Sequence, residues 1–86
     1  MPEISRFFGI TIAIYWHDHG VPHFHAKYGD LRASIAIEDL RTLEGKLPPR
    51  VAGFVHEWAL LHRDELMKNW ELAILKKPLQ PIQPLV

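Results

Sequence analysis

The chain has 86 residues, in which ten lysines and arginines balance ten aspartates and glutamates, and it contains no cysteine. Its length leaves room for a single domain over residues 1–86, and its balanced charge argues against the broad basic field of a duplex-nucleic-acid binder. The lack of cysteine excludes disulfides and thiolate metal sites.

The N-terminal half has the period of β-strands. Residues 3–16 are rich in isoleucine and aromatic side chains, and within residues 10–15 isoleucine alternates with other residue types. Residues 23–28 and 31–37 are typical of a hairpin, because the Gly-Asp pair between them favours a tight turn. We therefore expect an antiparallel sheet of three to five strands within residues 3–44.

The C-terminal half has a helical period instead. Pro48 and Pro49 suit a helix start, where a missing N–H is harmless. His62 falls on the apolar face of the helix that follows, and beyond it the apolar stripe drifts. The pattern predicts an α+β fold, in which the sheet is covered by one long or kinked helix over about residues 49–75. A kink or restart falls near residues 63–65, with Asp64 as a candidate N-cap.

The ends of the chain carry less information. Prolines three residues apart predict an extended tail over residues 76–86. The opening residues M-P-E-I-S-R-F-F lack the apolar core of a signal peptide, and no apolar run approaches the roughly 20 residues that span a bilayer. We therefore expect a cytoplasmic protein with no membrane partner.

Residues 17–25 hold four of the six histidines: His17, His19, His23 and His25. Residues two apart on a strand face the same side, so His23 and His25 can converge on one metal ion. The turn over residues 20–22 would return His19 as a third ligand. Imidazole ligands suit zinc, nickel or iron, and Asp18 would serve as an oxygen ligand or would orient a ring.

Two other interpretations compete with a metal site. In the first, His23 and His25 are the general acid and base of a small metal-independent ribonuclease, and Arg6 stabilises the phosphorane charge. Single-stranded RNA would then be a partner, because exposed aromatic side chains can stack on its bases and Lys27 can contact a phosphate. In the second, Phe24 faces the core and the histidines line a solvated sheet face.

Four blocks of the chain resemble successive motifs of one bacterial family: P-E-I-S-R-F-F-G-I, H-G-V-P-H-F-H-A-K-Y-G, L-E-G-K-L-P-P-R and W-A-L-L-H-R-D-E-L-M-K-N-W-E-L. That family is domain-of-unknown-function family 4160. The positions that match its pattern are Ser5, Arg6, Phe7, Gly9, His19, Pro22, His23, Phe24, His25, Ala26, Gly45, Leu47, Pro48, Trp58, His62 and Trp70. His17 and Val21 do not belong to the pattern.

The resemblance implies a short bacterial cytoplasmic protein, encoded beside another small domain in an arrangement similar to toxin–antitoxin pairs. It therefore implies an interaction or regulatory component of such a pair, with a histidine-lined ligand site. Hydrophobic residues make up 48% of the chain, which is high for so small a domain. This composition favours an interface with a second copy or with a small partner protein.

Overall fold

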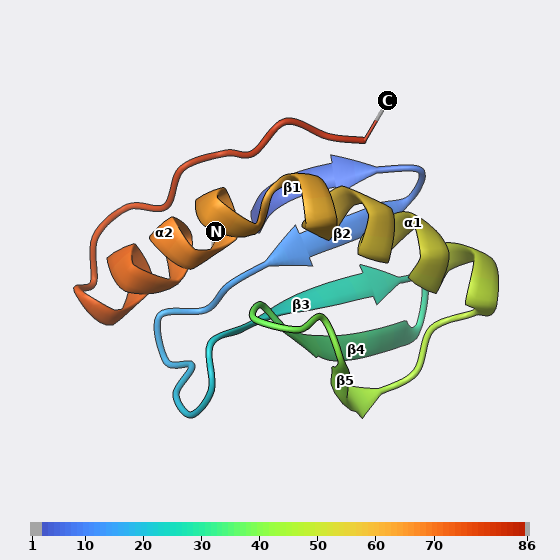
Figure 1. The fold of residues 1–86 in the computed structure, drawn as a ribbon, viewed down its shortest axis with the longest axis horizontal. Helices are drawn as coiled ribbons and strands as arrows, with labels where there is room; N and C mark the ends of the chain where they lie inside the picture. The colour runs from blue at the N-terminus through green and yellow to red at the C-terminus, as the bar shows by residue number, and fades with distance from the viewer. Residues whose placement is uncertain (1–2, 86) are drawn as a thin grey trace.

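The computed structural model describes residues 3–85. Five strands form one antiparallel sheet in the order β1-β2-β3-β4-β5, and each strand pairs with its neighbour along the chain (Figure 1). The strands are β1 (Glu3–Phe7), β2 (Ile10–Ala13), β3 (His23–Tyr28), β4 (Leu31–Ala36) and β5 (Thr42–Gly45). The predicted sheet and the hairpin between β3 and β4 are confirmed.

Two helices follow the sheet, α1 (Pro49–Leu61) and α2 (Arg63–Ile74). The α+β class is confirmed, but the prediction of one long or kinked helix is wrong. His62 leaves the helical conformation, with φ −127° and ψ 26°. Its ring packs on Trp58, with centroids 5.4 Å apart, and its Nδ1 lies 2.5 Å from a carboxylate oxygen of Glu65. Contacts at these spacings also occur within one continuous helix. The tertiary contacts at the break belong to Arg63, whose guanidinium donates to the main-chain carbonyls of Ile37 and Glu38. His62, not Asp64, occupies the N-cap position of α2.

The core lies between the sheet and the two helices, which cover the same face (Figure 1). Strands β2, β3 and β4 contribute alternate residues to the core, whereas all four residues of β5 are exposed. Phe24 of β3 and Trp58 of α1 are fully buried. The opposite face, here called the open sheet face, carries Thr11, His25, Lys27, Arg32 and Ser34, which are all half-buried or exposed. Within residues 3–85, no helix is both long and apolar enough to cross a membrane.

The C-terminal segment after α2 runs back along the helices toward β1 (Figure 1). The N–H of Ile82 donates to the carbonyl of Ile4 at 2.7 Å, and the Trp58 indole donates to the carbonyl of Gln83 at 2.8 Å. Buried Asn69 of α2 forms two hydrogen bonds with the main chain of Gln80. The segment therefore covers the side of the core next to β1.

Candidate metal centre

The carboxylate of Asp18 faces the imidazoles of His23 and His25. Its two oxygens lie 3.2 and 3.0 Å from Nε2 of His25, and one of them lies 3.6 Å from Nε2 of His23. All three side chains are mostly shielded from solvent, with exposed fractions of 15% for Asp18, 13% for His23 and 27% for His25. The three residues therefore form one cluster, a candidate metal site that we call the metal centre for brevity.

Local structure explains why these three side chains meet. His23 and His25 are two residues apart on β3 and share a face, while Phe24 between them points into the core. The loop before β3 folds back through a turn at Asp18, whose N–H donates to the Tyr15 carbonyl and whose carboxylate accepts the Tyr15 N–H, both at 3.0 Å. These two hydrogen bonds between Tyr15 and Asp18 hold the carboxylate beside the face of β3 that carries His23 and His25.

Each imidazole has a protein partner on its second nitrogen. Nδ1 of His23 lies 2.8 Å from the carbonyl of Val21, which can only accept a hydrogen bond, so this nitrogen carries a proton. Nδ1 of His25 lies 3.2 Å from the hydroxyl of Ser34. Both rings therefore present Nε2 to Asp18. A metal ion bound at this position would take Nε2 of both imidazoles and an oxygen of Asp18 as ligands.

The spacing of the donor atoms suits one small metal ion. One ligand atom from each of Asp18, His23 and His25 lies within 4.8 Å of the other two. Ligands about 2.0–2.1 Å from a tetrahedral metal lie roughly 3.3 Å from one another. One oxygen of Asp18, Oδ1, lies 3.2 Å from Nε2 of His25 and 3.6 Å from Nε2 of His23, and these two separations bracket that value.

Aromatic rings support the centre on several sides. The rings of His23 and His25 meet edge to face with centroids 5.0 Å apart. The Tyr15 ring lies 4.9 Å from His25, and the Trp70 indole of α2 lies 5.1 Å from His23. Because these contacts restrict both imidazoles, the metal centre is largely preorganised.

The other predicted site residues lie elsewhere. His17 and His19 are exposed in the loop before β3, and neither belongs to the three-residue cluster. The third residue of the cluster is Asp18, whereas the sequence pattern predicted His19 as the third ligand. Arg6 is 66% exposed and binds both carboxylate oxygens of Glu3. The structure therefore brings His23 and His25 together but leaves His19 and Arg6 outside their cluster.

Ser34 is a site residue that the sequence interpretation missed. It lies on β4 directly opposite His25, in the same register that pairs Lys27 with Arg32. The signal was present in the sequence, because a two-residue turn at Gly29 and Asp30 fixes which residues of a hairpin oppose one another.

Residues 9–71 match the profile of a family described as "Domain of unknown function (DUF4160)". The chain belongs to this family. Searches of curated proteins and of solved structures found no match. In this DUF4160 protein the matched span contains all three residues of the metal centre, together with Ser34 and Trp70.

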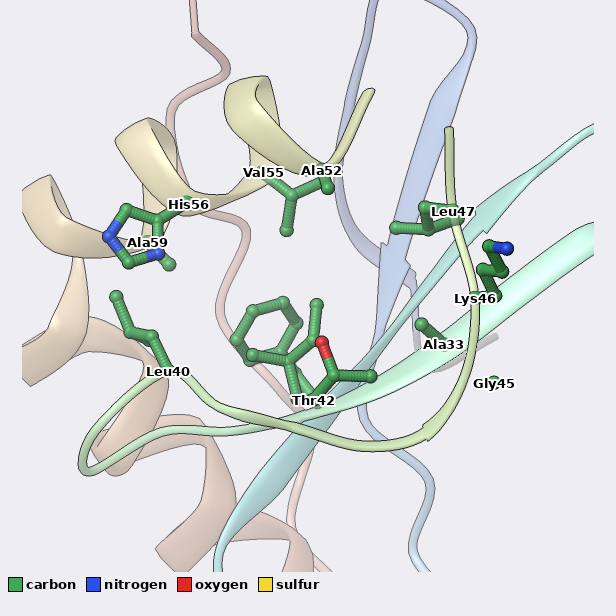
Figure 2. A pocket seen from close by; sticks show the side chains of 12 residues that line it. Ala33, Leu40, Thr42, Gly45, Lys46, Leu47, Ala52, Val55, His56 and Ala59 are labelled. Atoms are coloured by element: carbon green, nitrogen blue, oxygen red, sulfur yellow. The ribbon is translucent and has the colours of Figure 1, made fainter. Parts of the chain in front are cut away.

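This protein also has a separate, partly open cavity of about 350 Å³, between α1 and the strands β4 and β5. Figure 2 shows apolar side chains around it, with His56 at one end and Lys46 at the other. On the α1 side, Ala52 and Ala59 are small and leave this volume open. The cavity contains none of the residues of the metal centre.

Proposed function

We propose that the chain is a metal-binding domain in which Asp18, His23 and His25 hold one divalent transition metal ion. The observation that carries this proposal is the convergence of both Nε2 atoms on one carboxylate. Partners on both Nδ1 atoms strengthen it, since metal-binding imidazoles usually donate their second N–H to a carbonyl, carboxylate or water.

Two imidazoles and one carboxylate form a donor set that suits zinc and iron, and nickel also accepts imidazole ligands. Three protein ligands leave at least one coordination position for water or a ligand. The bound metal would act as a Lewis acid or would activate that water. Of the chain's own residues, Val21 and Ser34 orient the two imidazoles, and Tyr15 holds the carboxylate.

Metal content and affinity of untagged protein test the proposal. We expect one zinc, iron or nickel ion per chain by inductively coupled plasma mass spectrometry. Asp18→Asn and His23→Ala should each lose it. His19→Ala and His17→Ala are matched controls in the same loop and should keep it. Loss of metal in His19→Ala with retention in Asp18→Asn would overturn this ligand assignment.

A metal-independent ribonuclease that uses His23, His25 and Arg6 has weaker support. Each ring nitrogen of the two histidines already faces a protein partner, and Arg6 is engaged by Glu3. Cleavage of single-stranded RNA by metal-free protein, with loss of cleavage in both His23→Ala and His25→Ala, would favour this alternative.

We also propose that the chain is the interaction or regulatory component of a toxin–antitoxin-like pair. Large apolar side chains exposed at the helix ends support a partner surface, including Leu60 at 52% and Leu61 at 68%. Co-expression with the product of the neighbouring gene, followed by light scattering, tests this role. We expect a stable complex that Leu61→Arg weakens, whereas a chain that stays monomeric with that product would contradict it.

A further inference from the structure

We propose that the open sheet face binds a phosphoryl group between Lys27 of β3 and Arg32 of β4. The two residues are cross-strand partners, so their side chains leave the same face at directly opposed positions. Both are exposed, and within residues 3–85 neither forms an ion pair. Like charges in this arrangement repel one another. A bound anion would offset that repulsion.

A hollow of about 340 Å³ lies over this pair, and its polar lining comprises Tyr15, His25, Lys27, Arg32, Ser34 and Glu44. A second hollow, of about 230 Å³, shares Tyr15, His25 and Lys27 with the first and extends toward Thr11 and the ion pair of Arg6 with Glu3. The pairing of strands β1 to β4 explains this continuity, because Arg6, Thr11, Lys27 and Arg32 form one row across them. We call the two hollows together the cationic groove.

The chemistry of the groove favours a terminal phosphate. Arg32 offers a planar guanidinium fork and Lys27 a compact ammonium charge, a combination that suits phosphate oxygens. The hydroxyls of Tyr15 and Ser34 add hydrogen-bond donors beside them. Glu44 is the one carboxylate in the lining of the first hollow, so the two cations exceed it in charge. A phosphate monoester, with close to two negative charges and three acceptor oxygens, complements this lining.

The groove also adjoins the metal centre, because His25 lines both hollows and faces Asp18. If the metal-binding function proposed above holds, phosphate esters are the substrate class that this arrangement presents to the metal. This link rests on the proposed function. Phosphate binding by Lys27 and Arg32 does not.

The test is a titration of metal-free, ¹⁵N-labelled protein followed by NMR, with inorganic phosphate, uridine monophosphate and uridine as separate ligands. We expect saturable shifts of the β3–β4 amides with the two phosphates and none with uridine. Lys27→Gln/Arg32→Gln should weaken binding at least tenfold. Lys68→Gln/Lys77→Gln removes the same charge elsewhere and should leave binding unchanged. Equal weakening in both double variants, or shifts that do not saturate, would overturn the inference.

The two phosphate ligands distinguish the sources of the phosphoryl group. Tighter binding of the nucleotide assigns the groove to a phosphate ester, and equal binding assigns it to free phosphate. A single-stranded oligonucleotide without a terminal phosphate that binds more tightly than either would overturn the monoester assignment. Zinc binding without saturable phosphate binding refutes only the groove, whereas phosphate binding in protein that takes up no metal refutes only the metal centre.

Discussion

The imidazole of His23 lies against the indole of Trp70, with 5.1 Å between the ring centroids, so the metal centre and helix α2 pack on one another. The carbonyl of Val21 holds the same imidazole from the loop side, at 2.8 Å from Nδ1. Strand, loop and helix thus fix one ring together. Helix α2 is distant in the sequence from the loop and β3, so its contact with His23 forms only in the folded chain. Metal affinity and global stability should therefore be coupled through Trp70.

Replacement of Trp70 by leucine should therefore weaken zinc binding as well as folding. We expect a loss of about 2–4 kcal/mol in the free energy of unfolding and about tenfold weaker zinc binding. Trp58→Leu is the matched control, since Trp58 is equally buried but contacts Phe7, Phe24 and His62 instead of the centre. Denaturant unfolding and calorimetric zinc titration measure both quantities. Equal zinc affinity in the two folded variants would contradict the coupling.

Zinc should stabilise the folded chain by mass action. At a free concentration one hundred times the dissociation constant, the expected gain is about 2.7 kcal/mol, and chelation should reverse it. Acidification should abolish the gain, because imidazole binds metal only in its deprotonated form. Thermal unfolding with and without zinc across a pH series is the measurement. A zinc effect that persists in His23→Ala/His25→Ala would mean that the ion binds elsewhere.

Gly45 at the end of β5 should tolerate no side chain. Its φ is +82°, and a Cβ there would lie 2.1 Å from the carbonyl oxygen of Arg32. We expect Gly45→Ala to destabilise the fold by about 2–4 kcal/mol. At Gly29, φ is +60° but nothing lies within 4 Å of an added Cβ, so Gly29→Ala should cost only about 1 kcal/mol. Similar losses in the two variants would refute the close approach of β5 to β4.

Asn69 should anchor the C-terminal segment. Its side-chain amide donates to the carbonyl of Gln80 at 2.8 Å and accepts the N–H of Gln80 at 2.7 Å, and the residue is fully buried. Asn69→Ala removes both bonds and should cost about 2–4 kcal/mol. Gln80→Ala keeps the main-chain groups that form the bonds and should cost less than about 0.5 kcal/mol. Denaturant unfolding of the two variants checks this difference.

The carboxyl of Asp39 should titrate below the ordinary aspartate range. The backbone N–H of Arg41 is the largest cause of this lowered pKa, and the Arg41 guanidinium adds to it. Arg41→Ala keeps the backbone donor, so the pKa of Asp39 should rise only part of the way back. NMR titration of the side-chain carboxyl measures it. A full return to the ordinary value would assign the shift to the guanidinium alone.

The sequence by itself determined the sheet and the convergence of His23 and His25. Successive side chains point to opposite faces of any strand, and a two-residue turn fixes the register of a hairpin, so both are local properties. The motifs around the histidines also indicated the family. The same register contained the pairs of His25 with Ser34 and of Lys27 with Arg32.

Only the tertiary structure decided where the helices divide and which third residue faces the histidines. At the division, Arg63 donates to the main-chain carbonyls of Ile37 and Glu38, which are distant in the sequence, so the local helical pattern does not contain these contacts. The carboxylate of Asp18 faces His23 and His25 because its hydrogen bonds with Tyr15 fold the loop back against β3. The neighbouring His19 is exposed to solvent. Neighbouring loop residues share no fixed period, so their directions follow from the hydrogen bonds of the folded loop.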